Sequence, residues 1–269
     1  MKQNDKITPA ETADEKSAAF YDSYNYATFW DGRDYEHHSD AIALVSFLKQ
    51  NKTNHNLIID VGGGLGRLAP YYAPAFKEAV LLDPSVVQLE RTKSEIGETY
   101  PNLSFVRGIA QNLPFPDASV DTIVCVRVSH HIPDFADAIK EYMRVLSPGG
   151  YLILEIANKM HIKARINALL KGESKKINSE APIKVAEDQS KYDTPFVNHN
   201  PNRVKRELEK AGFKILDTRS ASNFRSQTLK KIIPKKALIF FDKILQKPLS
   251  YIKFGPSIYF LARKNKAKK

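Results

Sequence analysis

The stretch NLIIDVGGGLGRLAP, residues 56–70, decides the fold of this 269-residue chain. The apolar run 56–61 is short and ends in glycines, which is typical of a buried strand. A helix is expected to start at Gly66, so unpaired backbone N–H groups at the helix start can bind an anionic or polar ligand. We therefore predict a ligand-binding loop over residues 60–66.

On both sides of this loop, apolar runs alternate with helical patterns. Further strands are expected at 79–83, 103–106, 119–128, 151–156, 213–218 and 257–262, and helices at 39–49, 66–75, 86–97, 135–146, 162–170 and 201–212. The expected first helix places Ala41, Leu44, Val45 and Leu48 on one face. Pro148 and Gly149 occupy positions that suit a type II turn. Strands that alternate with helices predict βαβ units and an α/β fold with a doubly wound, mostly parallel sheet.

The bulk composition fits a globular protein, and the single cysteine suggests a reducing compartment. Hydrophobic residues make up 42% of the chain and charged residues 26%, which is ordinary for a globular protein. No apolar run approaches the roughly 20 residues that span a bilayer. Residues 1–16 are polar and do not resemble a signal peptide, and Cys125 is the single cysteine. We therefore expect a cytoplasmic protein.

The net charge of +11 belongs to the C-terminal quarter, because residues 203–269 hold 19 basic and only 4 acidic residues. Such a region can meet nucleic acid, anionic lipid or an acidic substrate, or can be a plain solvated surface. Within it, the sequence KKALIFFDKIL, residues 235–245, predicts an amphipathic helix with Leu238, Phe241 and Leu245 on one side. This pattern fits a membrane-surface helix through residues 230–250, a dimer contact or core packing.

An acidic residue follows the glycine loop at a spacing that points to a nucleoside. Asp83 closes the second expected strand, 21 positions after Gly62. This spacing suits a carboxylate that accepts hydrogen bonds from a ribose diol. The dinucleotide pattern G-x-G-x-x-G fails from Gly62 because Arg67 stands at its third glycine. Counted from Gly64 the pattern ends in Ala69, a permitted variant, so a nicotinamide or flavin enzyme remains an alternative.

Asp60, directly before the loop, favours a different cofactor. A carboxylate at this position attracts the ammonium and sulfonium groups of S-adenosylmethionine, whereas it would repel a pyrophosphate. The glycine loop and Asp83 predict a nucleoside cofactor, and Asp60 favours S-adenosylmethionine among the candidates.

These residues and several later motifs resemble the class I S-adenosylmethionine-dependent methyltransferases. DVGGGLG at 60–66 resembles the family's first motif, and GIAQNLPF at 108–115, the pair His130–His131 and RVLSPGG at 144–150 follow in the family's order. The resemblance covers residues 55–157, with AGF at 211–213 as a weaker match. It implies a Rossmann-like methyltransferase fold with a seven-stranded, mostly parallel sheet of order 3-2-1-4-5-7-6, the last strand antiparallel. It also implies methyl transfer that leaves S-adenosylhomocysteine as product.

The resemblance also implies a set of site residues. Asp60, Gly62, Gly64 and Gly66 would hold the methionine end of the cofactor, Asp83 the ribose hydroxyls, Ala110 and Gln111 the adenine, and Val126 and Arg127 the border of the methyl-transfer site. One position departs from the family. Ile109 stands where an Asp usually binds the adenine amino group, so adenine recognition would rely on backbone groups or on Gln111.

Catalytic and acceptor residues are predicted less directly. His130 and His131 follow the fourth expected strand, where either one is a candidate general base, with a structural role as the alternative. The aromatic stretch 20–35 is interpreted as a lid with Tyr26, Trp30 and Arg33 toward the acceptor, or as a helix packed on the sheet. No spacing of Cys, His or acidic residues predicts a metal site.

Residues 1–50 are thus expected to form a helical and aromatic lid segment. Residues 51–269 are expected to form the methyltransferase domain, with acceptor-pocket insertions near 158–200 and 220–255. The leading functional hypothesis is methyl transfer to an O, N or C atom of a small-molecule acceptor. An RNA methyltransferase, a peripheral-membrane lipid or quinone methyltransferase and a cofactor-binding regulator remain alternatives. The sequence leaves the acceptor and the oligomeric state open.

Overall fold

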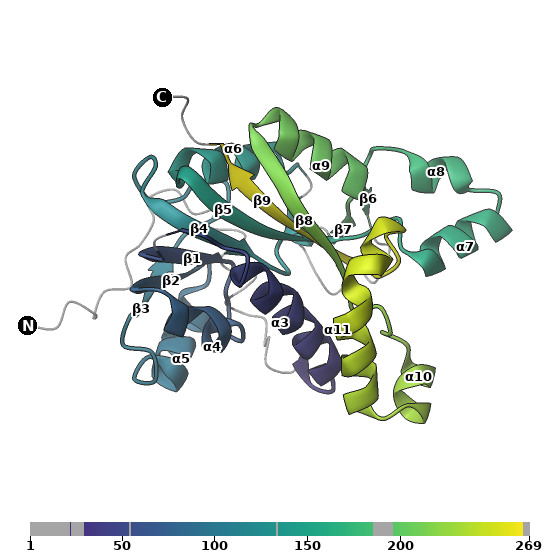
Figure 1. Cartoon of the computed structure of the whole chain (residues 1–269), viewed down its shortest axis with the longest axis horizontal. Coiled ribbons are helices and arrows are strands. Elements are labelled where there is room, and N and C mark those ends of the chain that lie inside the picture. Colours follow the sequence, from purple (N-terminus) through teal and green to yellow (C-terminus); the bar gives the residue numbers. More distant parts are fainter. Residues whose placement is uncertain (1–21, 23–29, 54, 133, 185–195, 266–269) are drawn as a thin grey trace, which may run out of the picture.

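A seven-stranded sheet forms the centre of the computed structural model, which describes residues 22, 30–53, 55–132, 134–184 and 196–265 (Figure 1). The spatial order is β3-β2-β1-β4-β5-β9-β8. In chain order the strands are β1 (Leu57–Val61), β2 (Glu78–Asp83), β3 (Leu103–Arg107), β4 (Val120–Cys125), β5 (Leu146–Ala157), β8 (Phe213–Ala221) and β9 (Ser257–Lys264). A small separate pair, β6 (Ile183–Lys184) and β7 (Val197–Asn198), lies beside it.

The strand directions bring six carboxyl ends to one edge of the sheet. β1 pairs in parallel with β2 and β4, β2 with β3, and β4 with β5, whereas β9 runs antiparallel to both β5 and β8. Counted along the chain, this order is 3-2-1-4-5-7-6 with the last strand antiparallel, so the prediction is confirmed. Ligands of open α/β sheets bind outside the carboxyl ends of the strands, which places the expected site at this edge.

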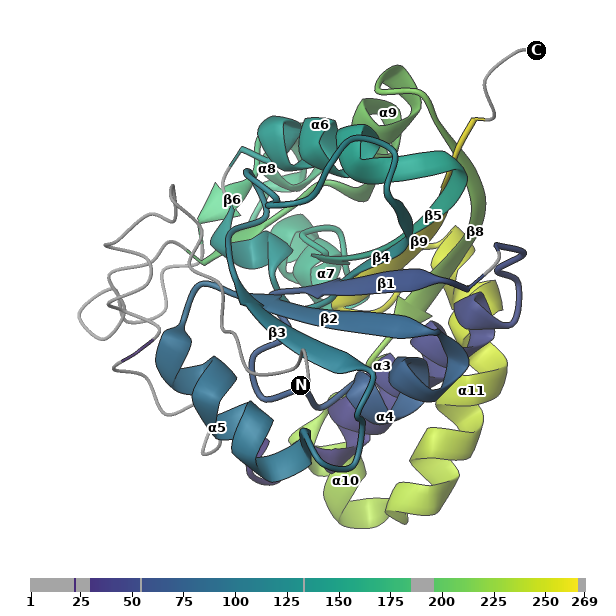
Figure 2. The same ribbon diagram turned by 90° about the vertical axis from the view of Figure 1, so that its left-hand side faces the viewer.

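Helices cover both faces of the sheet, as Figure 2 shows. One face carries α3 (Asp34–Leu48), α4 (Ala69–Tyr72), α5 (Val86–Ile96) and α11 (Lys235–Tyr251), and the other carries α6 (Ala136–Val145) and α9 (Pro201–Lys210). The remaining helices are α7 (Ile162–Leu170), α8 (Ser174–Asn178) and α10 (Gln227–Ile232), and short 3₁₀ turns are η1 (Ala73–Ala75) and η2 (Ser129–His131). Each face has its own apolar cluster, with Leu44 and Phe47 in one and Tyr142 and Leu208 in the other.

The first helix buries a different face from the expected one. α3 begins at Asp34, and Ala43 and Phe47 are buried, whereas Val45 and Leu48 are only partly buried. The predicted face was therefore partly wrong. The buried side of α3 also contains Glu36, Ser39 and Asp40, because polar partners from other elements meet them there.

Prolines and backbone conformation explain two further differences. The helix expected at 66–75 is only the four-residue α4 followed by η1, because Pro74 lacks the N–H that would continue an α-helix. The fourth strand ends at Cys125 rather than at 128, because Arg127 adopts a left-handed φ of 64° that interrupts extended backbone. β5 includes residues of the expected turn, where Gly149 has the positive φ of 84° that a type II turn requires.

Helix α11 buries only part of the side that the sequence predicted, Leu238, Phe241 and Leu245. Leu238 points inward and is 2% exposed, whereas Phe241, expected on the same side, is 49% exposed. The buried side of α11 is mainly polar, with Asp242, Gln246 and Ser250 beside Leu238. The predicted apolar face is therefore wrong at Phe241, because α11 packs mainly against polar residues of α3 and not against an apolar layer.

Asp242 shows why this polar contact holds. Its carboxylate accepts hydrogen bonds from the Tyr35 hydroxyl at 3.0 Å and from the Ser39 hydroxyl at 2.5 Å, both on α3. It also accepts from the Asn223 amide and from Gln246 Nε2. A buried carboxylate needs such donors to replace water.

Within the described residues, no helix is both long and apolar enough to cross a membrane.

Truncation of a core side chain on the second face tests the packing of α9. Leu208 is fully buried among the residues of this face. Leu208→Ala is expected to lower the free energy of unfolding by about 2–5 kcal/mol, because lost burial adds to an unfilled cavity. Lys210→Ala on the exposed side of the same helix should change it by less than about 0.5 kcal/mol. Urea unfolding followed by circular dichroism measures both; equal effects would contradict this packing.

Candidate functional site

The loop after β1 has a backbone that only glycine adopts without strain. Gly62, Gly64 and Gly66 have φ angles of 72°, 49° and 63°. A Cβ atom on Gly62 would lie 2.2 Å from Val128 Cγ2, and one on Gly66 would lie 2.8 Å from Thr92 and Ile96. Because glycine has no Cβ, the loop can pass between β1 and these side chains and still approach a ligand closely.

Asp83, at the carboxyl end of β2, fixes the loop from one side. Its Oδ2 accepts a hydrogen bond from the Gly64 N–H at 2.9 Å, and its Oδ1 accepts one from the Ser85 N–H at 3.0 Å. Burial raises the pKa of Asp83 to about 6, while these two backbone donors oppose the shift. The same spacing that predicted a ribose-binding carboxylate therefore places it directly against the loop.

Asp60, at the end of β1, is the second buried carboxylate. It is 3% exposed, and burial raises its pKa to about 7. Tyr72 and Arg67 lower this pKa, but they do not bring it back to its usual range. A buried acid with a raised pKa gains from a nearby cation that stabilises the charged form. The loop and its two acids thus fit a ligand with a positive charge and hydroxyl donors, whereas they would repel a pyrophosphate.

The other residues expected around the cofactor lie at the same edge of the sheet. Ala110 is buried and Gln111 is exposed in the connection after β3, where Ile109 and Asn112 form an isolated bridge. Val126 is buried directly after β4. No described contact assigns an adenine-binding role to any of them, and such a role stays a prediction.

The Arg127 side chain is held by α3. Its guanidinium donates to Asp40, with Nε 3.1 Å from Oδ2 and Nη2 2.8 Å from Oδ1, and its backbone N–H donates to Glu155 Oε2 at 3.0 Å. The strand-end arginine that was expected to border methyl transfer therefore connects β4 to α3 and β5.

Asp40 is the centre of a buried ionic cluster. Its carboxylate also pairs with Arg67 Nη2 at 2.9 Å and accepts from the Tyr259 hydroxyl at 2.6 Å. Burial alone would raise the pKa of Asp40, but Arg127 and Arg67 hold it below its usual value. One carboxylate thus joins α3, the end of the glycine loop, β4 and β9.

The aromatic segment before α3 reaches the same cluster. The guanidinium carbon of Arg67 lies 3.9 Å from the centre of the Trp30 ring, in a cation–π contact. Trp30 is partly buried, as is Arg33, whereas Tyr26 lies outside the described residues. The structure therefore places Trp30 next to Arg67, the residue that follows the glycine loop. An acceptor-facing role for Trp30 stays a prediction.

His130 and His131 lie in η2, just beyond β4. Their rings are 4.0 Å apart, and the His130 ring also packs at 4.3 Å from that of Phe196. Burial and the nearby His131 and Arg127 hold the pKa of His130 well below its usual value, and burial lowers that of His131 to about 4. Both rings are therefore neutral near pH 7, which makes them weak bases.

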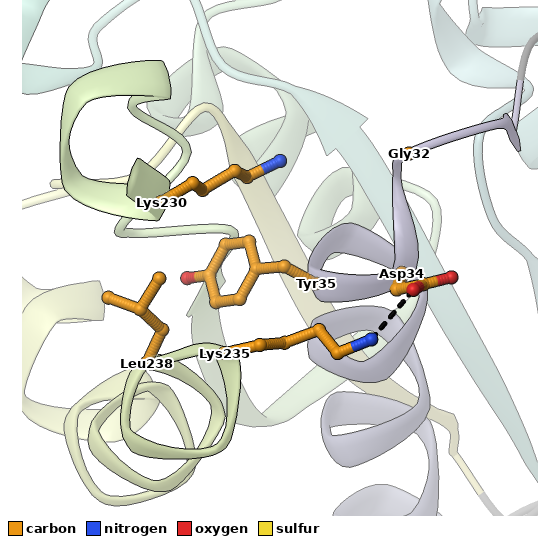
Figure 3. Close-up of a pocket in the computed structure, with 6 residues that line it drawn as sticks. All are labelled: Gly32, Asp34, Tyr35, Lys230, Lys235 and Leu238. Carbon is orange, nitrogen blue, oxygen red and sulfur yellow. Dashed lines mark hydrogen bonds and ion pairs between the residues drawn. The ribbon is translucent and has the colours of Figure 1, made fainter. Parts of the chain in front are cut away.

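A pocket of about 130 Å³ lies between the start of α3 and the helices α10 and α11 (Figure 3). Its lining residues are Gly32, Asp34, Tyr35, Lys230, Lys235 and Leu238. Lys230 pairs with Glu36 and Lys235 pairs with Asp34, so acids of α3 neutralise both cations. None of the residues that line the pocket belongs to the glycine loop.

Sequence reasoning missed several residues of this edge. Asp40, Tyr259 and Glu155 are all buried here. Phe196 packs on His130 of η2, and His199 Nε2 lies 2.8 Å from the Ser129 carbonyl oxygen of η2. One of them carried a signal, since Glu155 is an acid inside the apolar strand YLILEI and is 0% exposed. Asp40 looked like an ordinary surface residue of an amphipathic helix.

Comparison with known proteins agrees with this geometry. Residues 59–154 match the family model described as a methyltransferase domain. The chain is 35% identical over 98 residues to the uncharacterized methyltransferase YcgJ of Bacillus subtilis. This match covers 36% of this chain and 39% of that protein. It is 39% identical over 92 residues to phthiotriol/phenolphthiotriol dimycocerosates methyltransferase 1 of Mycobacterium ulcerans, covering 34% and 32%. The matches span about two-fifths or less of these relatives.

The fold resembles a chain of the complex between the Haloferax volcanii Trm112 methyltransferase activator and a putative methyltransferase. The TM-score is 0.62 at 14% identity, covering 91% of this chain and 97% of that one. Identity this low shows the fold alone. Residues 59–154 are therefore similar to methyltransferase domains, and the fold of the chain is that of solved methyltransferase structures.

Removal of the Asp40 charge tests the ionic cluster. Asp40→Asn is expected to lower the free energy of unfolding by about 3–5 kcal/mol, because two partly buried arginines lose their partner. Asp34→Asn, which removes an exposed ion pair on the same helix, should change it by less than about 1 kcal/mol. Chemical denaturation measures both, and similar values for the two variants would contradict the cluster's role.

Because the pKa of Asp60 is raised, replacing Asp60 by the uncharged Asn is expected to stabilise the protein by an amount that depends on pH. The raised pKa contributes stability that is complete below the ordinary value of 3.8 and is lost as pH rises through about 7. Asp60→Asn does not titrate, so without ligand it should gain on the order of 2–4 kcal/mol over wild type between pH 4 and pH 8. Unfolding at both pH values, with exposed Asp137→Asn as control, measures this gain; a pH-independent difference would contradict it.

Proposed function

We propose that this chain is an S-adenosylmethionine-dependent methyltransferase that transfers a methyl group to an O, N or C atom of a small-molecule acceptor. The observation that carries the proposal is the pair of buried acids on either side of the glycine loop. Asp60 has a pKa raised to about 7 and Asp83 one raised to about 6. Both would be stabilised in their charged forms by the ammonium and the ribose hydroxyls of this cofactor.

The residues of the loop then have separate roles. The open space beside Gly64 would receive the methionine end, since a Cβ there meets nothing closer than Asp83 Oδ2 at 3.8 Å. Asp60 would attract the ammonium, and Asp83 would accept from the ribose hydroxyls. Bound S-adenosylmethionine supplies a methyl group on a sulfonium, which leaves as S-adenosylhomocysteine forms.

The protein's part in such a displacement is to position the acceptor and exclude water. The neutral rings of His130 and His131 can orient an acceptor or take a proton from it, and their low pKa values suit a hydrogen-bond acceptor better than a strong base. Trp30, held on Arg67, is suited to cover the cofactor from the side of α3. Asp40 pairs with both Arg67 and Arg127, and Glu155 lies 3.9 Å from Arg127, so these acids reduce the repulsion between the two arginines and a sulfonium.

A membrane-associated acceptor is the second candidate. The exposed aromatic residues of α11 favour it over an RNA acceptor, because nucleic-acid backbones need cations and not apolar side chains. The acceptor itself follows from neither the loop nor the two acids.

Calorimetry with three ligands separates the roles of the two acids. Wild-type protein is expected to bind S-adenosylmethionine, S-adenosylhomocysteine and methylthioadenosine, which lacks the amino-acid end. Asp83→Ala should weaken all three by about 100-fold or more, because two charge-assisted hydrogen bonds are lost. Asp60→Asn should weaken the first two and leave methylthioadenosine unchanged.

Asp137→Ala, an exposed carboxylate on α6, is the matched control and should bind all three ligands as wild type does. Tight binding of a nicotinamide dinucleotide, or no binding of any adenosyl ligand by the wild type, would overturn the proposed function.

A further inference from the structure

The outer side of α11 exposes large apolar side chains in an ordered row. Phe240 is 58% exposed, Ile244 54% and Tyr251 72%. At the helical angle of about 100° per residue these three positions fall within about 40° of one another around the helix axis. Phe241 borders the row on one side, and Phe240 and Phe241 contact each other edge to face. We call Phe240, Phe241, Ile244 and Tyr251 the outer face of α11.

Lysines border this face on its other side. Lys236, Lys243 and Lys247 follow one another at helical spacing next to Phe240 and Ile244. Lys247 is paired with Asp217, but within the described residues no ion pair forms to Lys236, Lys243 or the nearby Lys231. These three lysines are exposed, so their charge faces the solvent.

The acidic residues that would balance this charge are missing from the surrounding segment. Residues 225–253 contain eight Lys and Arg residues and one acidic residue, Asp242. Asp242 is fully buried against α3 and does not reach the surface. The inner side of α11 thus uses polar contacts to hold the helix on the protein, while the outer face combines apolar side chains with positive charge.

We propose that the outer face of α11 docks the protein on an anionic lipid membrane surface. An interfacial helix inserts apolar side chains into the boundary between headgroups and acyl chains while adjacent lysines bind anionic headgroups. Both parts of this pattern are present on one side of α11. An RNA would bind the lysines but would leave the apolar side chains of Phe240 and Ile244 without a partner. A second copy of this chain would bring the same positive charge to the contact, and like charges repel.

The fold connects α11 to the carboxyl edge of the sheet. α10 follows β8, whose carboxyl end lies at the same edge of the sheet as the glycine loop, and α11 follows α10. Lys235 at the start of α11 pairs with Asp34 at the start of α3, and Asp40 in α3 contacts Arg67 after the loop. Membrane docking is independent of cofactor identity, so it does not depend on the proposed function.

Vesicle sedimentation tests the proposal with the full chain and no cofactor. Wild-type protein is expected to pellet with phosphatidylcholine–phosphatidylglycerol vesicles, to bind pure phosphatidylcholine far less, and to lose affinity as salt screens the lysines. Lys236→Gln with Lys243→Gln should weaken binding by about 30-fold, as expected for two lysines near an anionic surface. Phe240→Ser with Ile244→Ser should weaken it by at least about tenfold, because their insertion is lost.

Matched controls change similar residues elsewhere. Lys77→Gln with Lys214→Gln removes two exposed lysines, and Val87→Ser with Leu216→Ser removes two exposed apolar side chains. Both double variants should bind vesicles as wild type does. Calorimetry with S-adenosylhomocysteine and thermal unfolding of every variant show whether its fold and its loop are intact.

Four results would overturn the proposal. The first is a wild type that does not bind anionic vesicles. The second is a Phe240→Ser, Ile244→Ser variant that binds them as well as wild type does. The third is a wild-type dimer, seen by light scattering, that this variant abolishes, because a second copy would then cover the face. Binding to transfer RNA that outcompetes vesicles would assign the surface to nucleic acid instead. None of these results bears on adenosyl-ligand binding, so the two proposals can fail separately.

Discussion

The buried carboxylate of Asp40 is the interaction on which the arrangement of this protein depends. An ionised carboxylate away from water is stable only when its oxygens have charged or hydrogen-bonding partners. Asp40 has Arg67, Arg127 and Tyr259, which come from the end of the glycine loop, from the end of β4 and from β9. Because these partners lie far apart in the chain, one side chain of α3 fixes the carboxyl edge of the sheet.

Around this edge the protein holds charge in two different ways. Asp40 is fully paired, and its pKa lies below the usual range, whereas Asp60 and Asp83 are buried with raised pKa values. The paired acid is structural, while the two unbalanced acids beside the loop lower the stability of the free protein at neutral pH. Such a conflict between stability and charge is expected where a ligand completes the arrangement.

Patterns of short range predicted much of the fold. The alternation of strands and helices follows from local apolar periodicity, and the positive φ angles of Gly62, Gly64 and Gly66 match what a glycine run after a strand implies. Helix faces were less predictable. The buried side of α3 and the exposure of Phe241 on α11 both depend on polar partners from distant segments, so apolar spacing alone did not predict them.

By itself, the sequence determined the order of the elements, the glycine loop and the positions of Asp60 and Asp83, because each depends on residue types a few positions apart or on strand ends that meet at one edge. Only the tertiary structure decided that Arg127 faces Asp40, that Trp30 rests on Arg67 and that Asp242 draws the polar side of α11 inward. These contacts join residues up to 203 positions apart, and no local spacing encodes which buried charge meets which donor.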